Sequence, residues 1–319
     1  MRVTLKDIAK EAGVSTALVS YCLNGSKSGW MSEKTRKRIE EAAKKLDYRP
    51  NRLARSLRTG KTRSIGMLVG NISDSYFGHL AEEVLEAARK RDYSLVLAVS
   101  KHENEERENA LEFLMRNQID ALLTCSSLVN LPEAKNLKKN GIPVVRFGYP
   151  EPDAISLQDN VENALKDACR YLKDRGHRSM FCFFDTPLPW NSLIAGIANE
   201  LGIELVHRTF NSFRESHEIF QWIENNRPSA ILMNGRILYQ LLELIRKIPD
   251  YFPEIIRGVD EFYHQWETPL VIGGILSNTT LKAQRAVDIL IERLENPDLS
   301  REGIILLPSS KFISYKSIQ

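Results

Sequence analysis

The chain has 319 residues, of which 43% are hydrophobic and 27% are charged; these values are ordinary for a folded protein and exclude a disordered one. Its length fits about two domains, and no apolar run reaches the roughly 18 residues that a membrane span needs. The first residues lack the apolar stretch of a signal peptide, and the four cysteines form no Cys-x-x-Cys pair. We therefore expect a cytoplasmic protein without a disulfide framework or a zinc site.

The charge is distributed unevenly along the chain. Residues 1–63 contain 16 Lys and Arg against 6 Asp and Glu, a net charge of +10. Residues 64–319 contain 28 basic and 35 acidic residues, a net charge of −7. This contrast indicates that the first segment meets a polyanion and that the rest does not. A solvated basic tail is the alternative, and the choice depends on whether the basic segment folds.

Two short helices are predicted at the start of the chain. The segment Thr4–Ala12 begins with a capping box that its first residue forms with Asp7, and apolar residues recur on one face. Gly13 can end this helix in the left-handed conformation. Ser15 is a good N-cap for a second helix over Thr16–Leu23. Two short helices joined by a tight turn with glycine are typical of a helix-turn-helix.

A third helix is predicted from its cap Ser32 to Leu46, with Ile39, Ala42 and Ala43 on its apolar stripe. Many positions in and around the three helices follow one pattern: Thr4–Ser15, Val19-Ser20, Leu23–Gly25, Ser32–Arg36, Leu46–Asn51 and Ala54–Leu57. This pattern closely resembles the DNA-binding headpiece of the lactose/galactose repressor family (LacI/GalR). The resemblance implies a headpiece over residues 1–49, a hinge helix and linker over 50–63, and a homodimer that binds double-stranded operator DNA.

In such a headpiece the second helix lies in the major groove, with its N-terminal side chains toward base edges. Thr16, Ala17 and Tyr21 take those positions here. Tyr21 stands where many relatives have Arg or His, so the guanidinium that would grip guanine is missing and the preferred half-site should differ. The predicted phosphate contacts are Ser15, Ser20, Asn24, Lys27, Thr35 and Arg36, and Thr4 completes the predicted headpiece contacts.

The segment Asn51–Leu57 can form a short helix and is followed by a basic stretch. By resemblance it is the hinge helix, which orders on operator DNA, pairs with its dimer mate and inserts an apolar wedge into the minor groove. A flexible linker in the free protein is the alternative. The predicted contacts of this segment are Asn51, Ala54, Arg55, Leu57 and Arg58.

From Ser64 onward, short apolar runs alternate with helical stretches, which is typical of βαβ units on parallel sheets. The expected strands are Ile65–Val69, Leu95–Val99, Ala121–Thr124, Val144–Phe147, Met180–Phe184, Glu204–His207, Ala230–Met233, Ile255–Gly258, Val271–Gly273 and a final strand Ile304–Leu307. The expected helices are Phe77–Arg89, Glu105–Arg116, Pro132–Lys139, Val161–Arg175, Ser192–Leu201, Glu215–Asn225, Ile237–Lys247 and Asn278–Leu294.

The fold class expected is therefore a helical helix-turn-helix headpiece followed by two doubly wound α/β lobes over residues 64–319. This arrangement resembles the periplasmic-binding-protein fold, the sensor core of the same family. The first lobe would hold about 64–158 and 278–295, and the second about 159–277 and 296–319. The chain would cross between the lobes near Gln158–Asp159, Ser277 and Asn296.

Two such lobes place the ends of their strands around a shared cleft, where ligands usually bind. By resemblance, the predicted effector-binding residues are Ser73, Tyr76, Phe77, Phe147, Asp159, Trp190, Leu193, Asn234 and Asp260. Packing in the hydrophobic core is the alternative for each aromatic residue, and helix capping is the alternative for Asp260. Leu193 replaces an Arg that commonly binds ligand hydroxyls in the family. A simple sugar effector is therefore in doubt, and a phosphorylated, more apolar or protein effector, or none, remains open.

Enzyme chemistry has little support in the sequence. It contains no His-Glu-x-x-His, no Gly-x-Ser-x-Gly and no Gly-x-Gly-x-x-Gly motif, and Arg55 stands where a P-loop ending in Gly60-Lys61-Thr62 needs glycine. We expect no enzyme activity, no cofactor and no bound metal. A sugar-binding carrier is the stronger rival, but it would be exported and lack the headpiece. The sequence predicts a cytoplasmic, nucleoid-associated regulator under the control of a small molecule. Its simplest role is repression of carbohydrate uptake or catabolism genes, and activation of genes remains an alternative.

Overall fold

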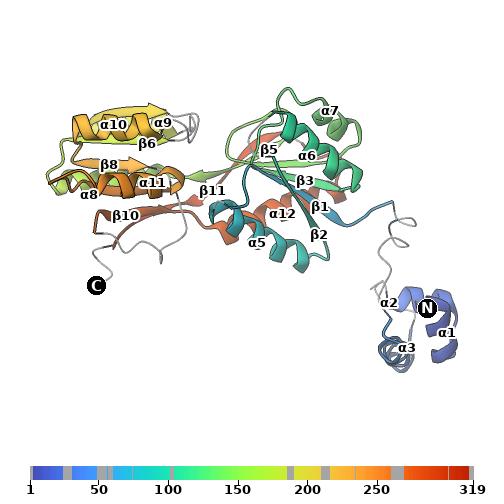
Figure 1. Ribbon diagram of the computed structural model, residues 1–319. Coiled ribbons are helices and arrows are strands. Elements are labelled where there is room, and N and C mark those ends of the chain that lie inside the picture. Colours follow the sequence, from blue (N-terminus) through green and yellow to red (C-terminus); the bar gives the residue numbers. More distant parts are fainter. Residues whose placement is uncertain are drawn as a thin grey trace. The chain divides into compact units, whose positions relative to one another are not determined.

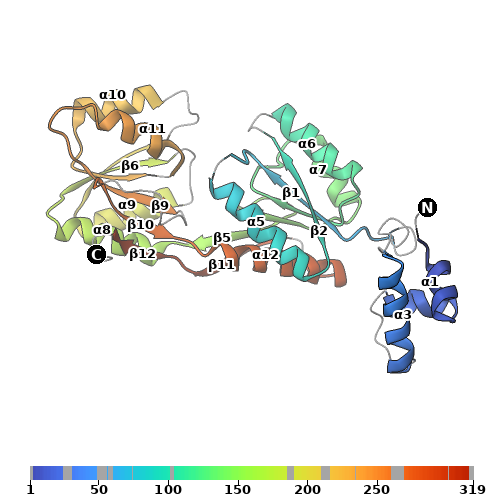
Figure 2. The ribbon, with the colours of Figure 1, turned by 60° about the horizontal axis from the view of Figure 1, so that its bottom comes forward.

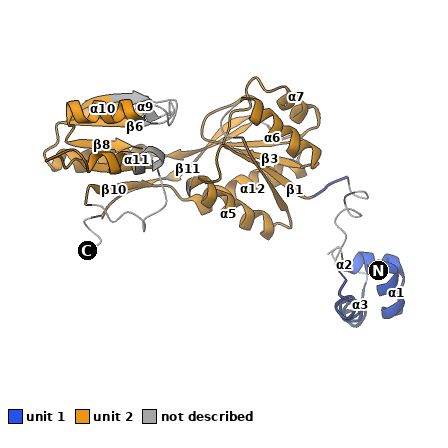
Figure 3. Ribbon diagram, in the orientation of Figure 1, with its two compact units in different colours: residues 1–62 blue, residues 63–319 orange. Residues whose placement is uncertain are grey.

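The computed structural model describes residues 3–23, 31–48, 56, 60–73, 75–100, 104–184, 190–209, 216–233, 235–259, 269–300 and 302–315. The chain divides into two compact units, residues 1–62 and residues 63–319 (Figure 3). Within the described residues, no helix has both the length and the apolar character that a membrane crossing requires. The same residues contain no group of three or more His, Cys, Asp or Glu side chains placed to hold a metal ion.

The first unit contains the three predicted helices: α1 (Leu5–Ala12), α2 (Thr16–Leu23) and α3 (Glu33–Lys45). At the start of α1, the backbone N–H and the hydroxyl of Thr4 both donate to the Asp7 carboxylate, at 2.8 and 2.7 Å. Gly13 ends this helix with a φ of 61°, a left-handed conformation that costs glycine little. These features confirm the predicted helix-turn-helix.

The core of the first unit is small and takes one fully buried side chain from each helix: Ile8, Val19 and Ile39. Helices of 8, 8 and 13 residues are too short to be stable alone in water. Their stability therefore depends on this shared contact. An ion pair of 2.6 Å between Lys45 and Glu11 joins α3 to α1 at the surface.

The second unit is built on two six-stranded sheets (Figures 1 and 2). The first sheet is wholly parallel, in the order β11-β5-β4-β3-β1-β2. Its strands are β1 (Ser64–Val69), β2 (Ser94–Val99), β3 (Ala121–Thr124), β4 (Val144–Phe147), β5 (Ile155–Asn160) and β11 (Gly303–Ser309). We call this sheet with its helices the first lobe.

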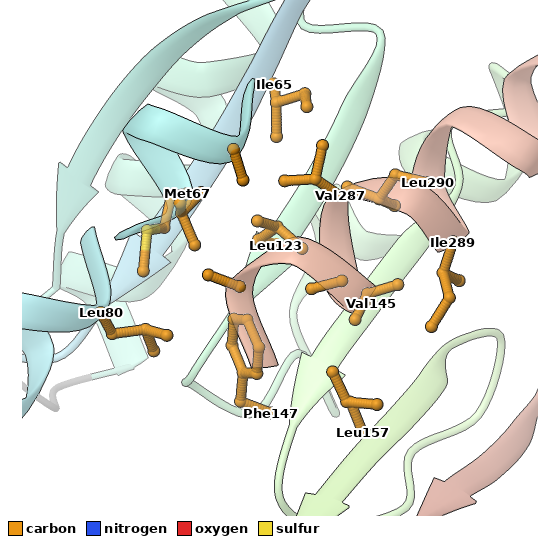
Figure 4. Close-up of a cluster of buried hydrophobic side chains, with 14 of the residues drawn as sticks. Ile65, Met67, Leu80, Leu123, Val145, Phe147, Leu157, Val287, Ile289 and Leu290 are labelled. Carbon is orange, nitrogen blue, oxygen red and sulfur yellow. The ribbon is translucent and has the colours of Figure 1, made fainter. Parts of the chain in front are cut away.

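The helices of the first lobe are α5 (Ser75–Lys90), α6 (Asn104–Arg116), α7 (Pro132–Lys139) and α12 (Thr279–Glu295). Because side chains alternate along each strand, each face of the sheet has its own core. On one face, α5 and α12 pack over Met67, Leu123 and Val145 (Figure 4). On the other face, α6 and α7 pack over Leu68 and Leu122.

The second lobe has the sheet order β12-β10-β9-β8-β6-β7. Its strands are β6 (Ser179–Phe184), β7 (Glu204–Thr209), β8 (Ala230–Met233), β9 (Glu254–Val259), β10 (Val271–Leu276) and β12 (Lys311–Ser314). All neighbouring strands are parallel except β10 and β12. Its helices are α8 (Glu162–Asp174), α9 (Trp190–Leu201), α10 (Ser216–Asn226) and α11 (Gly235–Ile245). Helices α8 and α9 cover one face, and α10 and α11 cover the other.

One predicted lobe boundary is wrong. Residues 296–319 were expected in the second lobe, but β11 pairs with β5 and completes the edge of the first sheet. The third crossing therefore lies at Ser310, between β11 and β12, and not near Asn296. The physical reason is that β11 buries Leu307 against the first lobe's core, which places the strand there.

Candidate functional site

The N-terminal end of α2 is the exposed end of the helix-turn-helix. The Ser15 hydroxyl accepts a hydrogen bond of 3.2 Å from the backbone N–H of Leu18, so it caps the helix. Ser15, Thr16 and Ala17 are all exposed, while the predicted contacts Ser20 and Tyr21 are partly buried. The structure therefore exposes three consecutive small side chains at the start of α2.

The N-terminus of α3 carries the next predicted contacts. Ser32 caps the helix by accepting from the backbone N–H of Thr35 at 3.2 Å, and the hydroxyls of the same two residues lie 2.8 Å apart. The side chains of Thr35 and Arg36 are partly buried. Arg38, one turn further along, donates to the Gly13 carbonyl and so joins α3 to the turn of the helix-turn-helix.

The basic charge of this unit lies outside its core. Of the described Lys and Arg residues in the three helices, all except Arg36 are exposed. These exposed residues are Lys6, Lys10, Lys34, Lys37, Arg38, Lys44 and Lys45. Asp7, Glu11, Glu33, Glu40 and Glu41 on the same helices are exposed as well, so basic residues only moderately outnumber acidic ones on this described surface.

Several predicted residues lie outside the described residues, so the structure says nothing of them. In the first unit these are Asn24, Lys27, Asn51, Ala54, Arg55, Leu57 and Arg58. In the second unit these are Asn234 and Asp260, together with the side chain of Trp190.

In the second unit, Asp159 forms a partly buried network where the chain passes between the lobes. One carboxylate oxygen accepts from the Ser277 hydroxyl at 2.5 Å, and the other accepts from Lys282 Nζ at 2.6 Å. Lys282 Nζ also donates to the Tyr76 hydroxyl at 3.2 Å. The network thus joins two crossing segments to α12 and α5, and it brings two predicted effector residues, Tyr76 and Asp159, to one cation.

The electrostatics of this network follow from burial. Lys282 is only 2% exposed, and burial alone would lower the pKa of its ammonium group. Tyr76 and Asp159 outweigh burial and raise the pKa of Lys282 above its usual value. Burial raises the pKa of Tyr76 to about 12. At neutral pH the network therefore holds a charged lysine and a neutral tyrosine.

The other described effector candidates are dispersed. Ser73 is exposed, and its backbone N–H donates to Asn71 Oδ1 at 2.9 Å. Phe77 packs edge-on against Tyr76, with 5.4 Å between the ring centroids. Phe147 is 7% exposed and lies among the core residues in Figure 4, so packing accounts for it. Leu193 is partly buried against the core of the second lobe.

Sequence reasoning missed Ser277 and Lys282 as members of this site. The buried positions of α12 are Thr279, Lys282, Ala283, Ala286, Val287, Ile289 and Leu290. A lysine on this apolar stripe breaks the helical pattern and requires a buried acidic partner. This break in the apolar pattern was the signal that the sequence offered. The acidic partner of Lys282 could not be identified from the sequence, because the position of the crossing segment was not known.

The two units together define a class of protein: a helix-turn-helix joined to a two-lobed α/β fold. Residues 4–51 match the model of the family described as bacterial regulatory proteins, lacI family. Residues 62–208 match the model for periplasmic binding proteins and the sugar binding domain of the LacI family.

Curated relatives and solved structures agree with this class. The ribose operon repressor of Escherichia coli (strain K12) is 34% identical over 327 residues, covering 96% of this chain and 97% of the repressor. Catabolite control protein A of Streptococcus mutans is 32% identical over 276 residues, 81% of each chain. A lac repressor dimer solved with operator and an anti-inducer shares the fold, with a TM-score of 0.78, 19% identity and 98% coverage of both chains.

The chain therefore belongs to the lacI family of bacterial regulatory proteins. It is a DNA-binding transcription regulator with a helix-turn-helix and a periplasmic-binding-protein-like sensor unit.

Proposed function

We propose that this protein is a homodimeric repressor of carbohydrate uptake or catabolism genes, controlled by a small-molecule effector. The observation that carries the proposal is the exposed start of α2, where Ser15, Thr16 and Ala17 lie on a three-helix unit within a segment of net charge +10, residues 1–63. Two such units in a dimer would contact successive major grooves of a pseudo-palindromic operator. The relatives support this role, since the similar E. coli protein is a ribose operon repressor.

The DNA contacts divide into two kinds. Thr16 and Ala17 at the tip of α2, with Tyr21 one turn further, are the proposed base-reading residues. Ser15, Ser20, Thr35 and Arg36 are the proposed phosphate contacts of the described helices, with Thr4 beside them; Asn24 and Lys27 complete the set. The hinge residues Asn51, Ala54, Arg55, Leu57 and Arg58 would act in the minor groove, where Leu57 would kink the duplex.

The effector would bind between the lobes, because the ends of parallel strands form the usual ligand position of such α/β folds. A solved cellobiose complex of the regulator CelR shares this fold, with a TM-score of 0.66. Ser73, Tyr76 and Asp159 of the first lobe would supply polar groups to the effector, and Asn234, Asp260 and Trp190 would complete the site from the second lobe. An effector acts only through different affinities for the DNA-binding and the non-binding states. The protein would act in the cytoplasm, on the nucleoid, and without catalysis.

Selection of genomic fragments with the purified protein tests this function. We expect the recovered fragments to share a pseudo-palindrome beside genes for sugar uptake or breakdown. Affinity should fall on the order of 10³-fold or more between 50 and 200 mM salt if 6–10 phosphates are engaged. No preference for any duplex over random competitor, with or without metabolite extract, would overturn the proposal.

A further inference from the structure

The connection between β4 and β5 contains no helix. Parallel strands are usually joined by a crossover of roughly a dozen residues or more, most often a helix, whereas residues 148–154 alone join this pair. The Ser156 hydroxyl donates to the Tyr149 carbonyl at 2.8 Å. Because Ser156 alternates with Ile155 and Leu157, which face α5 and α12, this contact holds the connection on the same face of the sheet as α7. A groove lies between α7 and the connection.

This groove is mainly apolar and has the size of a small-molecule site. Its volume is about 710 Å³, and ligand sites usually have roughly 300–1,000 Å³. Its buried lining residues include Leu137, Val144 and Ala154. Other lining residues leave apolar surface open to solvent, since Val129 is 49% exposed and Ile142 is partly exposed. A hydrocarbon group that covers this surface is bound favourably, because apolar area is then removed from water.

A buried carboxylate fixes the shape of the groove. One oxygen of Glu151 accepts from the Ser127 hydroxyl at 2.9 Å. The same oxygen accepts from the backbone N–H groups of Leu128 and Val129, at 2.5 and 2.8 Å. The other oxygen pairs with Arg146 at 3.1 Å, and the Glu151 side chain is only 3% exposed. The loop after β3 and the connection are therefore tied to each other, and a preformed groove requires little ordering when a ligand binds.

The positive charges that line the groove outnumber the negative ones. Helix α7 contributes three exposed residues, Lys135, Lys138 and Lys139. The acidic lining residues are Glu151, which has its buried arginine partner, and Asp153, which pairs with Lys138 at 2.7 Å. Within the described part of the chain, neither Lys135 nor Lys139 forms an ion pair. Their spacing of four residues places these two lysines on one side of the helix, so both can face a single acidic group.

We propose that this groove binds an amphipathic carboxylate, a small molecule with a hydrocarbon body and one acidic head group. The body would cover the apolar lining, and the head group would face Lys135 and Lys139. The groove lies between one short helix and one connection, so it suits a small molecule better than a protein, which covers roughly 800 Å² per partner in a stable complex. None of its lining residues belongs to the proposed DNA or effector contacts, so this site does not depend on the proposed function.

Isothermal titration calorimetry of the full chain tests the site with two probes, decanoate and 2-naphthoate, each kept below the concentration at which it aggregates. We expect saturable binding, and the probe with the higher affinity tells whether the hydrocarbon body is a flexible chain or a flat ring. Decylammonium has the same chain as decanoate and the opposite charge. It should bind at least about tenfold more weakly than decanoate, because the lysines repel it.

Two variants separate the apolar and the charged part of the site. Ala134 lines the groove and is partly exposed, so Ala134→Phe should fill the space and abolish binding of both carboxylates. The double variant Lys135→Gln/Lys139→Gln should weaken decanoate binding about tenfold, the combined effect of two exposed charges. Lys173→Gln/Lys247→Gln removes two exposed lysines of the second lobe and is the matched control, which should bind decanoate as the wild type does.

Several outcomes would overturn this site. They are no saturable binding of either carboxylate, equal binding by all variants, and equal affinity for decanoate and decylammonium. Tighter binding of an acidic amphipathic peptide than of either carboxylate would assign the groove to a protein instead. A loss of self-association in Ala134→Phe, measured by sedimentation velocity, would assign it to a second copy of the chain. If Ala134→Phe lowers the melting temperature, the two lysine double variants decide, because all four lysines are exposed.

Discussion

At the scale of single residues, Lys282 of α12 is a buried group whose charged form depends on its neighbours. Lys282 lies on the apolar face of its helix, yet it is charged because Asp159 and the Tyr76 hydroxyl contact its ammonium group. A buried ion pair adds little to stability by itself, but the loss of one partner leaves a buried charge without compensation. The main role of this ion pair is therefore to hold the crossing segment at Asp159 in a defined position against α12.

We expect Lys282→Met to lower the free energy of unfolding by about 3 kcal/mol, because it leaves the partly buried carboxylate of Asp159 without its cation. Urea denaturation at neutral pH measures the loss. The double variant Lys282→Met/Asp159→Asn should recover part of it, since both charges are then gone. Lys166→Met, which removes a helix-surface ion pair with Glu162, serves as the control and should change stability by under about 1 kcal/mol. An equal loss in both single variants would contradict the role of the network.

Glu254 is a second residue whose pKa is strongly changed by its surroundings. Its carboxylate accepts from the Arg175 guanidinium, and it lies 2.9 Å from His177 Nε2. The hydrogen bond from Arg175, with help from His177 and against the effect of burial, lowers the pKa of Glu254 from 4.5 to about 2. The contacts join the loop before β6 to the start of β9, at the end of the second sheet where these interior parallel strands begin.

The pH dependence follows from the sign of that shift. The folded pKa lies below the unfolded one, so the carboxylate stabilises the protein above about pH 4.5, and the stabilisation is lost as the pH falls toward 2. We expect Glu254→Gln to cost on the order of 3 kcal/mol at pH 7. The difference from wild type should shrink steadily between pH 5 and pH 2 in urea denaturation. A difference in stability between wild type and Glu254→Gln that does not vary with pH would show that the pKa of Glu254 is not lowered in the folded protein.

At the scale of elements, α3 shows how one cap supports a helix too short to be stable alone. Ser32→Ala removes the acceptor for the Thr35 N–H and should destabilise α3 by about 1 kcal/mol. Hydrogen exchange on the full chain should show about fivefold lower protection for the amides of this helix. Protection in α8, in the other unit, is the internal control, and an equal fall there would indicate a general effect.

Most elements were predictable because their patterns are local. The cap Ser32 and the periodic Ile39 and Ala42 fix α3, and the apolar runs at β3, β4 and β8 match the observed strands residue for residue. Two strands were missed. In β5 the buried half Ile155–Leu157 is followed by polar Gln158–Asn160, and β12 has only four residues. Their structure depends on distant partners, which a single sequence window does not contain.

The candidate site was less predictable than the fold. Asp159 and Tyr76 were named in advance, but the cation that joins them lies more than 120 residues further along the chain than Asp159. Ser277 shares no local motif with Asp159, and only the three-dimensional arrangement brings the two residues together.

At the scale of the whole molecule, the two lobes are interleaved in sequence. The chain builds most of the first lobe, passes into the second after Asn160, returns at Ser277 for α12 and β11, and enters the second again at Ser310. Three chain segments connect the two lobes of the sensor unit, so a movement of one lobe can be transmitted to the other. This connectivity suits a protein in which ligand binding must alter the geometry of both lobes.

The pairing of β11 with β5 also bears on how the protein is made. During synthesis, β5 leaves the ribosome long before its neighbour, because nearly 150 residues separate the starts of the two strands. Until β11 is translated, one border of the first sheet has unpaired N–H and C=O groups, which can pair wrongly with another nascent chain. A strand that is made late thus closes the sheet that much earlier strands began.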